Sequence, residues 1–180
     1  MAEKLVFDHT VESLLLTLKR PIPHAQVAAL DALGIDLSKP LLPAYPVDIY
    51  SALIGFIAHQ HWPDLPPAEA DFEVGRAFIS AYSTQTMMGR ALKGVTRVIG
   101  PHRTVERMSR SFRTANNFTE TRLKRLGPTH YELWFNFTTR PGYFRGMVHG
   151  AVGLCGVEQI EVKLVATQGH EVTYHVSWKP

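Results

Sequence analysis

The sequence predicts an α+β fold in which N-terminal helices pack on a mostly antiparallel sheet, and three observations lead to this prediction. Apolar residues recur at helical spacing up to about residue 115. From residue 116 the period changes to two in four short segments. A helical segment separates the second of these from the third. The C-terminal part is therefore expected to form two hairpins that are joined by a helix and pair into one sheet.

Length and composition favour a single domain over residues 1–180. Of the 180 residues, 45% are hydrophobic and 19% are charged, which is enough apolar material to form a core. We expect a mainly helical part, residues 1–115, followed by the hairpin–helix–hairpin part, residues 116–180. The longest apolar run, residues 47–58, is shorter than a bilayer span, and the first residues lack the features of a secretory signal. These features predict a cytoplasmic protein.

Prolines and glycines predict where the helices begin and end. Helical spacing predicts a first helix with Thr10 as its N-cap and a second helix that ends at Gly34. Pro46 begins the third helix. A later helix extends to Gly100, and Pro101 begins a short basic helix after it.

The C-terminal part alternates apolar and polar residues in two pairs of segments. Gly127-Pro128 and Gln168-Gly169-His170 provide the turns of the two hairpins. We expect strands over 118–126 and 131–137, a helix over 141–156, and strands over 160–165 and 172–178.

A strongly basic segment interrupts an otherwise acidic chain. Residues 90–125 carry a net charge of +8, whereas the remainder carries −5. On helices its side chains would form faces that attract phosphates, and Phe112 and Phe118 could stack on bases. The alternative is a solvated face that balances the acidic remainder. The candidates for binding an anion or a nucleic acid are Arg90, Lys93, Arg97, Arg103, Arg107 and Arg110.

Glycines and methionines in the helical segments indicate an apolar pocket. A glycine inside a helix costs about 1 kcal/mol relative to alanine, so several of them indicate either close helix packing or space for a bound molecule. Methionine adapts to irregular ligands. Arg113 with the two asparagines after it could hold a polar head group, or the asparagines could only shape a turn. The ligand-binding candidates are Met87, Met88, Phe112, Arg113, Asn116, Asn117, Phe144 and Met147.

The sequence contains no motif typical of catalysis or metal binding. The single cysteine, Cys155, excludes an internal disulfide and a zinc ribbon, and its place on an apolar helix stripe predicts a core residue. His59 and His61 are two residues apart, so on a helix their side chains would diverge by about 200°. We therefore assign no catalytic residue, no metal site and no cofactor.

Several stretches resemble a myxobacterial family of uncharacterised proteins. The resemblance lies in residues 33–37 with 40–46, in 112–120 and in 131–136, and it extends over nearly the whole chain. Ala115 stands where that family has a glycine. The family has no assigned activity, so the resemblance implies membership and no chemistry.

The C-terminal part is also similar, more distantly, to the vinyl-reductase-like and TRAPP-subunit superfamily. The similarity lies in the order of hairpin, helix and hairpin, with Phe144, Gly146 and Gly150 on the helix. It implies an α/β sensor or scaffold domain of a kind that often dimerises and binds apolar or aromatic small molecules. Some members bind zinc through cysteines near the last hairpin, but this chain has none there.

The leading functional hypothesis is a non-enzymatic sensory, regulatory or adaptor domain. It would bind a small, partly apolar or aromatic molecule, or a partner protein, and act as a homodimer. The alternative is nucleic-acid or nucleotide binding through the basic segment Arg90–Arg113. An enzyme of unknown type is a third possibility, because side chains with shifted pKa values are not visible in a sequence.

Overall fold

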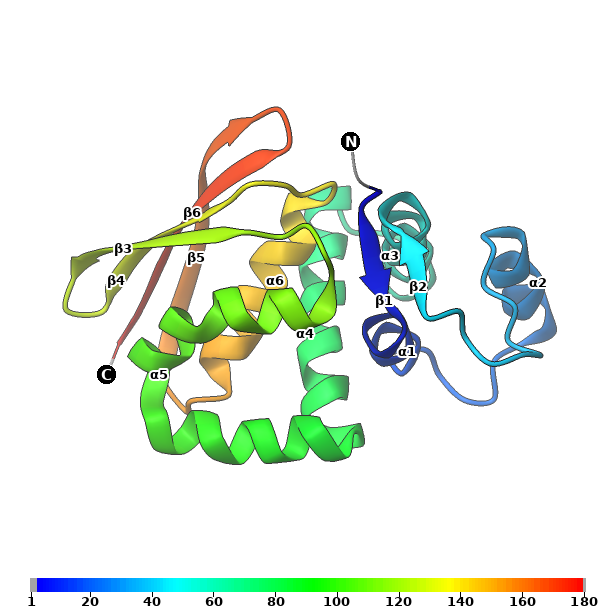
Figure 1. Cartoon of the computed structure of the whole chain (residues 1–180), viewed down its shortest axis with the longest axis horizontal. Coiled ribbons are helices and arrows are strands. Elements are labelled where there is room, and N and C mark those ends of the chain that lie inside the picture. The colour runs from blue at the N-terminus through cyan, green and yellow to red at the C-terminus, as the bar shows by residue number, and fades with distance from the viewer. Residues whose placement is uncertain (1–2, 180) are drawn as a thin grey trace.

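The computed structural model describes residues 3–179, with only the backbone of Ser109, and it confirms the predicted α+β class. Figure 1 shows a four-stranded sheet with helices α4, α5 and α6 beside it and the N-terminal elements on the far side of α4. None of the described helices is long and apolar enough to cross a bilayer. The elements in chain order are β1 (Leu5–Phe7), α1 (Asp8–Leu15), α2 (His24–Ala32), β2 (Ala44–Pro46), α3 (Val47–His61), α4 (Pro67–Gln85), α5 (Met87–Ala115), β3 (Thr121–Gly127), β4 (His130–Phe135), α6 (Pro141–Gly153), β5 (Glu158–Gln168) and β6 (Glu171–Lys179).

The N-terminal elements are tied together by a short antiparallel pair of strands, β1 and β2. Val6 lies opposite Tyr45 in this pair, and both side chains are buried. Strand β1 continues directly into α1, whose N-cap is Phe7, so the prediction of Thr10 as the N-cap is wrong. Thr10 instead lies inside α1, where its hydroxyl donates a hydrogen bond of 3.3 Å to the carbonyl oxygen of Ala115.

Helix α5 consists of two helical halves that meet at Gly100. Gly100 has a φ of +75°, a conformation that residues with a Cβ rarely adopt, and Pro101 begins the next helical segment. This confirms the break that the sequence predicts. We call Met87–Ile99 the N-terminal half of α5 and Pro101–Ala115 its C-terminal half. The two halves point in different directions beside α6 (Figure 1).

The sheet has the strand order β3-β4-β6-β5, so the two hairpins join through β4 and β6. Alternate residues of β4 and β6 are buried, as the period of two predicts. Helix α6 and the C-terminal half of α5 pack on this buried face, since the ring of Phe135 lies 5.3 Å from that of Phe144 and 5.2 Å from that of Phe112. The Tyr174 hydroxyl also donates a hydrogen bond of 2.7 Å to the Pro141 carbonyl oxygen at the start of α6.

Helices α4 and α6 cross with their backbones in contact. A Cβ atom built on Gly75 would overlap the Tyr143 carbonyl oxygen, and one on Gly146 would overlap the Phe72 carbonyl oxygen. Gly142 is equally close to α4. At these three positions the glycines serve close helix packing, which was one of the two roles that the sequence left open.

Two partly buried histidines are expected to make the fold less stable in acid. Burial lowers the pKa of His149 below its ordinary value of 6.5, and the nearby Arg76 guanidinium lowers it further. Burial, with Lys19 nearby, also lowers the pKa of His61. Between 6.5 and these lowered values the unfolded chain binds more protons than the folded chain, so stability is present above pH 6.5 and decreases as pH falls through the folded-state pKa.

Urea unfolding at pH 7.5 and at pH 5.5 measures this loss. We expect the variant H149Q to lose less free energy of unfolding between these pH values than the wild type does. The matched control is H59Q, which changes an exposed histidine of the same chain. An unchanged pH dependence in H149Q would contradict the prediction.

Candidate functional site

A cavity of about 590 Å³ lies where α1, α3, α4, α5 and α6 meet. This volume is within the range of small-molecule sites. Both halves of α5 contribute to its wall, so the change of direction at Gly100 creates the space between them.

The wall from the N-terminal half of α5 is an apolar stripe. Met88, Leu92, Val95 and Ile99 follow helical spacing, and all four side chains line the cavity. Protein atoms cover them poorly: Leu92 is 39% exposed and Val95 is 46% exposed. Helix α6 contributes further apolar groups to the lining, among them Phe144, Met147, Val148 and Ala151. The site therefore offers water-accessible apolar surface inside a concave wall.

Two buried tyrosines of the cavity lining form a hydrogen-bonded pair. The hydroxyls of Tyr50 on α3 and Tyr143 on α6 lie 2.6 Å apart, and both residues line the cavity. Burial raises the pKa of both phenols, so both stay protonated. Each phenol has one O–H, and their mutual bond uses only one of the two hydrogens. Tyr143 is fully buried and Tyr50 is only 7% exposed, so the pair is almost closed off from solvent.

Thr138 adds a second buried polar group to the lining. It is only 4% exposed, and its Oγ1 atom has no hydrogen-bond partner among the residues that the structure describes. A buried hydroxyl without a partner costs about 1 to 3 kcal/mol. An oxygen or nitrogen atom of a bound molecule would recover this free energy.

The structure brings together some of the ligand-binding candidates. Met88, Phe112, Asn116, Phe144 and Met147 all line the cavity. Outside the lining are Met87, Arg113 and Asn117.

Both asparagines of the predicted polar cluster bind the backbone through their side chains. The side chain of Asn116 accepts hydrogen bonds from the backbone N–H groups of Phe118 and Thr119, which is turn geometry. Asn117 accepts one of 2.8 Å from the Leu5 N–H, and this bond holds β1.

The basic candidates also divide into residues that line the cavity and residues that lie outside it. Arg107 and Arg110 line the cavity, whereas Lys93, Arg97 and Arg103 lie outside it. The Arg90 guanidinium donates to backbone carbonyl oxygens of residues 84 and 85 at the end of α4. Nucleic-acid binding by these residues stays a prediction.

The two phenylalanines that were expected to stack on bases are partly buried and pack against other aromatic rings. Phe112 contacts Phe135 and Phe144, and Phe118 contacts Phe137 with their ring centres 5.4 Å apart. Both rings also line the cavity, so any stacking partner would have to reach them there.

The reactive side chains near the cavity make internal contacts. Burial raises the pKa of the Cys155 thiol, which donates a hydrogen bond of 3.3 Å to the Thr104 hydroxyl. His102 Nδ1 lies 2.8 Å from the Tyr131 hydroxyl, and its ring packs against Trp178. Within residues 3–179 no group of three His, Cys, Asp or Glu side chains could hold a metal ion.

Tyr50, Tyr143 and Thr138 were not among the site residues predicted from the sequence. Tyr50 shares helical spacing with Leu53, Ile54 and Ile57, a pattern that is typical of a core residue. Its pairing with Tyr143 joins helices that are 93 positions apart in the chain. The one signal in the sequence is the polar hydroxyl on an otherwise apolar stripe.

Solved structures of H-NOX proteins are similar to this chain over almost its whole length. An oxygen-binding H-NOX domain related to soluble guanylate cyclases is 17% identical with a TM-score of 0.65, over 96% of this chain and 94% of that chain. An H-NOX mutant from T. tengcongensis is 16% identical with a TM-score of 0.57, over 96% of each chain. A protein studied for the modulation of heme redox potential through porphyrin distortion is 16% identical with a TM-score of 0.66, over 96% of this chain and 94% of that one.

At these identities the likeness shows the fold alone. The similar structures are H-NOX domains and not vinyl-reductase-like or TRAPP-subunit proteins, which corrects the more distant resemblance inferred from the C-terminal part. Among curated proteins, none matches the chain. Residues 4–179 match the family described as "Protein of unknown function (DUF2378)", as the resemblance to an uncharacterised family led us to expect, and the chain belongs to this family.

Proposed function

We propose that this chain is a non-enzymatic sensory domain that binds a partly apolar small molecule in the cavity between α5 and α6. The observation that carries the proposal is the apolar stripe of Met88, Leu92, Val95 and Ile99, which lines the cavity and is poorly covered by protein. Covering this surface would contribute about 25 cal/mol for each Å² removed from water. The unpartnered Thr138 hydroxyl of the lining favours a ligand that also carries an oxygen or nitrogen atom.

Heme is the first ligand to consider, because the similar structures include a protein studied for its heme redox potential. Proteins hold heme iron through His, a Cys thiolate, a Tyr, or a Met together with a His. The one imidazole in the described lining is that of His9, whose side chain is 52% exposed and lies beside Asp8. His102 lies outside the lining and contacts Tyr131 instead.

The other donor types do not fit heme iron better. The Cys155 thiol lies outside the lining and stays protonated because burial raises its pKa. Tyr50 and Tyr143 are hydrogen-bonded to each other as neutral phenols. Burial also raises the pKa of Tyr82, the third tyrosine of the lining, so it too stays a neutral phenol. The thioethers of Met88, Met108 and Met147 are weak neutral ligands without a buried histidine partner in the lining. The residues present do not fit a heme held through its iron, so the proposed ligand has no metal centre.

Nile red, an uncharged apolar dye, tests the proposal. We expect its fluorescence to rise on binding to the wild-type protein. The variant L92Q places an amide in the cavity wall. We expect it to lower the affinity for the dye about tenfold, since burying a leucine contributes about 1.5 to 3 kcal/mol. The control is V98Q on the same half of α5, because Val98 is 86% exposed and lies outside the lining.

Equal dye affinity in L92Q and the wild type, or no binding to the wild type at all, would refute the proposed cavity. Added hemin provides an independent check. We expect no absorption bands typical of heme iron bound to protein side chains. Such bands would show that the cavity does hold a side chain able to bind heme iron.

A further inference from the structure

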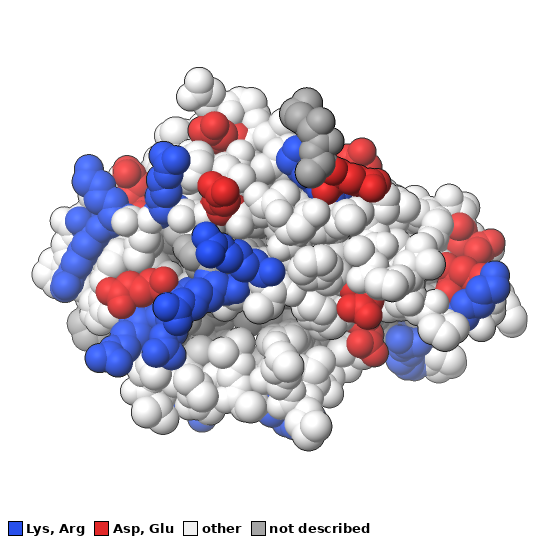
Figure 2. Space-filling model, in the orientation of Figure 1, with Lys and Arg blue, Asp and Glu red and all other residues white. Residues whose placement is uncertain are grey.

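Two arginines of α5 line the cavity without an acidic partner. Arg107 and Arg110 are three residues apart, so their side chains share one face of the C-terminal half of α5. No carboxylate of residues 3–179 forms an ion pair with either of them. Figure 2 shows basic side chains gathered over this half of α5, next to a hollow in the surface. Their charge is therefore available to a ligand.

The rest of the described lining does not balance this charge. It contains no aspartate, glutamate or lysine, and apart from the two arginines its one titratable cation is His9. Both arginine side chains are exposed, so water can reach them and they can meet a charged head group that remains partly hydrated. A guanidinium also binds carboxylate and phosphate oxygens through paired N–H donors. A cavity of this kind selects for negative charge at one end and apolar surface along the rest.

We propose that the ligand of this cavity is an amphipathic anion. Its carboxylate or phosphate head group would lie on Arg107 and Arg110, and its apolar body would lie along the stripe of Met88, Leu92, Val95 and Ile99. This inference rests on the proposed function and adds the chemical class of the ligand. It also gives a role to Arg107 and Arg110, whose presence in the lining the apolar stripe does not explain.

Displacement of Nile red by ligands that differ only in their head group tests this inference. Dodecanoate and dodecyl phosphate carry an anionic head, and 1-dodecanol carries a neutral one on the same chain. We expect both anions to compete about 10- to 100-fold more strongly than the alcohol, which is the range for a hydrogen bond to a charged group. The relative strength of the two anions identifies the preferred head group.

A pair of double variants separates the site from general surface charge. In R107Q/R110Q we expect the affinity for dodecanoate to fall about 10- to 100-fold, to that of 1-dodecanol, while the affinity for the alcohol stays unchanged. The control R103Q/R113Q removes the same charge from exposed residues of the same helical half that lie outside the lining. It should keep the preference for the anion.

The outcomes distinguish this inference from the proposed function. Binding of Nile red and of 1-dodecanol without a preference for the anions would overturn the head-group inference and leave the apolar cavity intact. An equal loss of affinity for dodecanoate in R103Q/R113Q would also overturn the head-group inference. The preference for the anion would then come from the overall positive charge of this helical half. Failure of every probe, dye included, would refute the proposed function itself.

Discussion

Replacing Gly146 by alanine is expected to destabilise the fold by about 3 kcal/mol, at the upper end of the usual cost of overpacking. The new Cβ would overlap the Phe72 carbonyl oxygen on α4. A backbone atom cannot rotate away as a flexible side chain can, so the two helices must separate. This separation would also displace Tyr143, which lies on the same helix and hydrogen-bonds to Tyr50. Denaturant unfolding of G146A measures the effect.

Gly94 provides the matched control for this substitution. It lies inside the N-terminal half of α5, is exposed, and has no atom within 4 Å of the place where a Cβ would be. We expect G94A to gain about 0.5 to 1 kcal/mol, because alanine favours the helix over glycine. If G146A were as stable as the wild type, the close crossing of α4 and α6 would be wrong.

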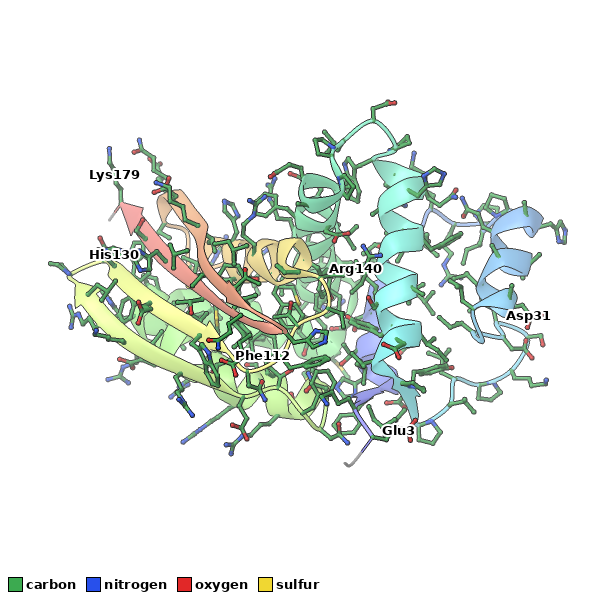
Figure 3. All side chains as sticks on the ribbon, turned by 90° about the horizontal axis from the view of Figure 1, so that it is seen from above. Glu3, Asp31, Phe112, His130, Arg140 and Lys179 are labelled. Atoms are coloured by element: carbon green, nitrogen blue, oxygen red, sulfur yellow. The ribbon has the colours of Figure 1, made fainter. Side chains whose placement is uncertain are left out.

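Removing the Arg140 side chain is expected to cost about 2 kcal/mol. Arg140 lies between α3 and the pair of helices α4 and α6 (Figure 3), where its Nε donates to the Ser51 carbonyl oxygen and its guanidinium contacts Asp71 at 2.7 Å. Gly55 leaves room for this guanidinium. The variant R140M would leave the Asp71 carboxylate, whose side chain is only 10% exposed, without its partner. Breaking a fully buried pair costs about 3 to 5 kcal/mol, and the partial exposure of Arg140 reduces that figure.

The pH dependence of R140M provides the internal check. Burial raises the pKa of Asp71, and Arg140 opposes this rise. Without the arginine, the folded-state pKa lies further above the unfolded value, so stability is present at low pH and is lost as pH rises through the folded-state pKa. The deficit of R140M in urea unfolding should therefore shrink between pH 7 and pH 4. The double variant D71N/R140M should be more stable than R140M at pH 7. If both variants lost the same free energy of unfolding, the unpaired charge of Asp71 would not be the cause.

Most helix and strand positions could be predicted because they depend on local chemistry. Gly34 and Gly100 adopt positive φ values at the helix boundaries that the sequence indicated, and both hairpins form. The period of two appears in the burial of the inner strands β4 and β6, whereas the outer strands β3 and β5 are mostly exposed. Strand β2 was not predicted, since three residues within a proline-rich stretch show no period. Thr10 was misassigned as a cap because its partner, the Ala115 carbonyl, lies 105 positions away.

The candidate site could be predicted only in outline. The apolar spacing of Leu92 and Val95 is visible in the sequence, but an apolar stripe is equally typical of a helix packed in a core. The sequence left open whether the two asparagines hold a polar head group or only shape a turn, and the hydrogen bonds of Asn116 and Asn117 to the backbone support the turn. Of six similar basic candidates, only Arg107 and Arg110 reach the cavity.

The sequence by itself determined the fold class, the position of the helix break at Gly100, the concentration of positive charge in one segment and the lack of a catalytic motif. Only the tertiary structure decided that the two halves of α5 leave a cavity, that Tyr50 meets Tyr143 inside it, and which two arginines line it. The physical reason is one of range. Turns, caps and periodicity act between residues a few positions apart, whereas a cavity exists only where elements distant in the chain fail to fill the space between them.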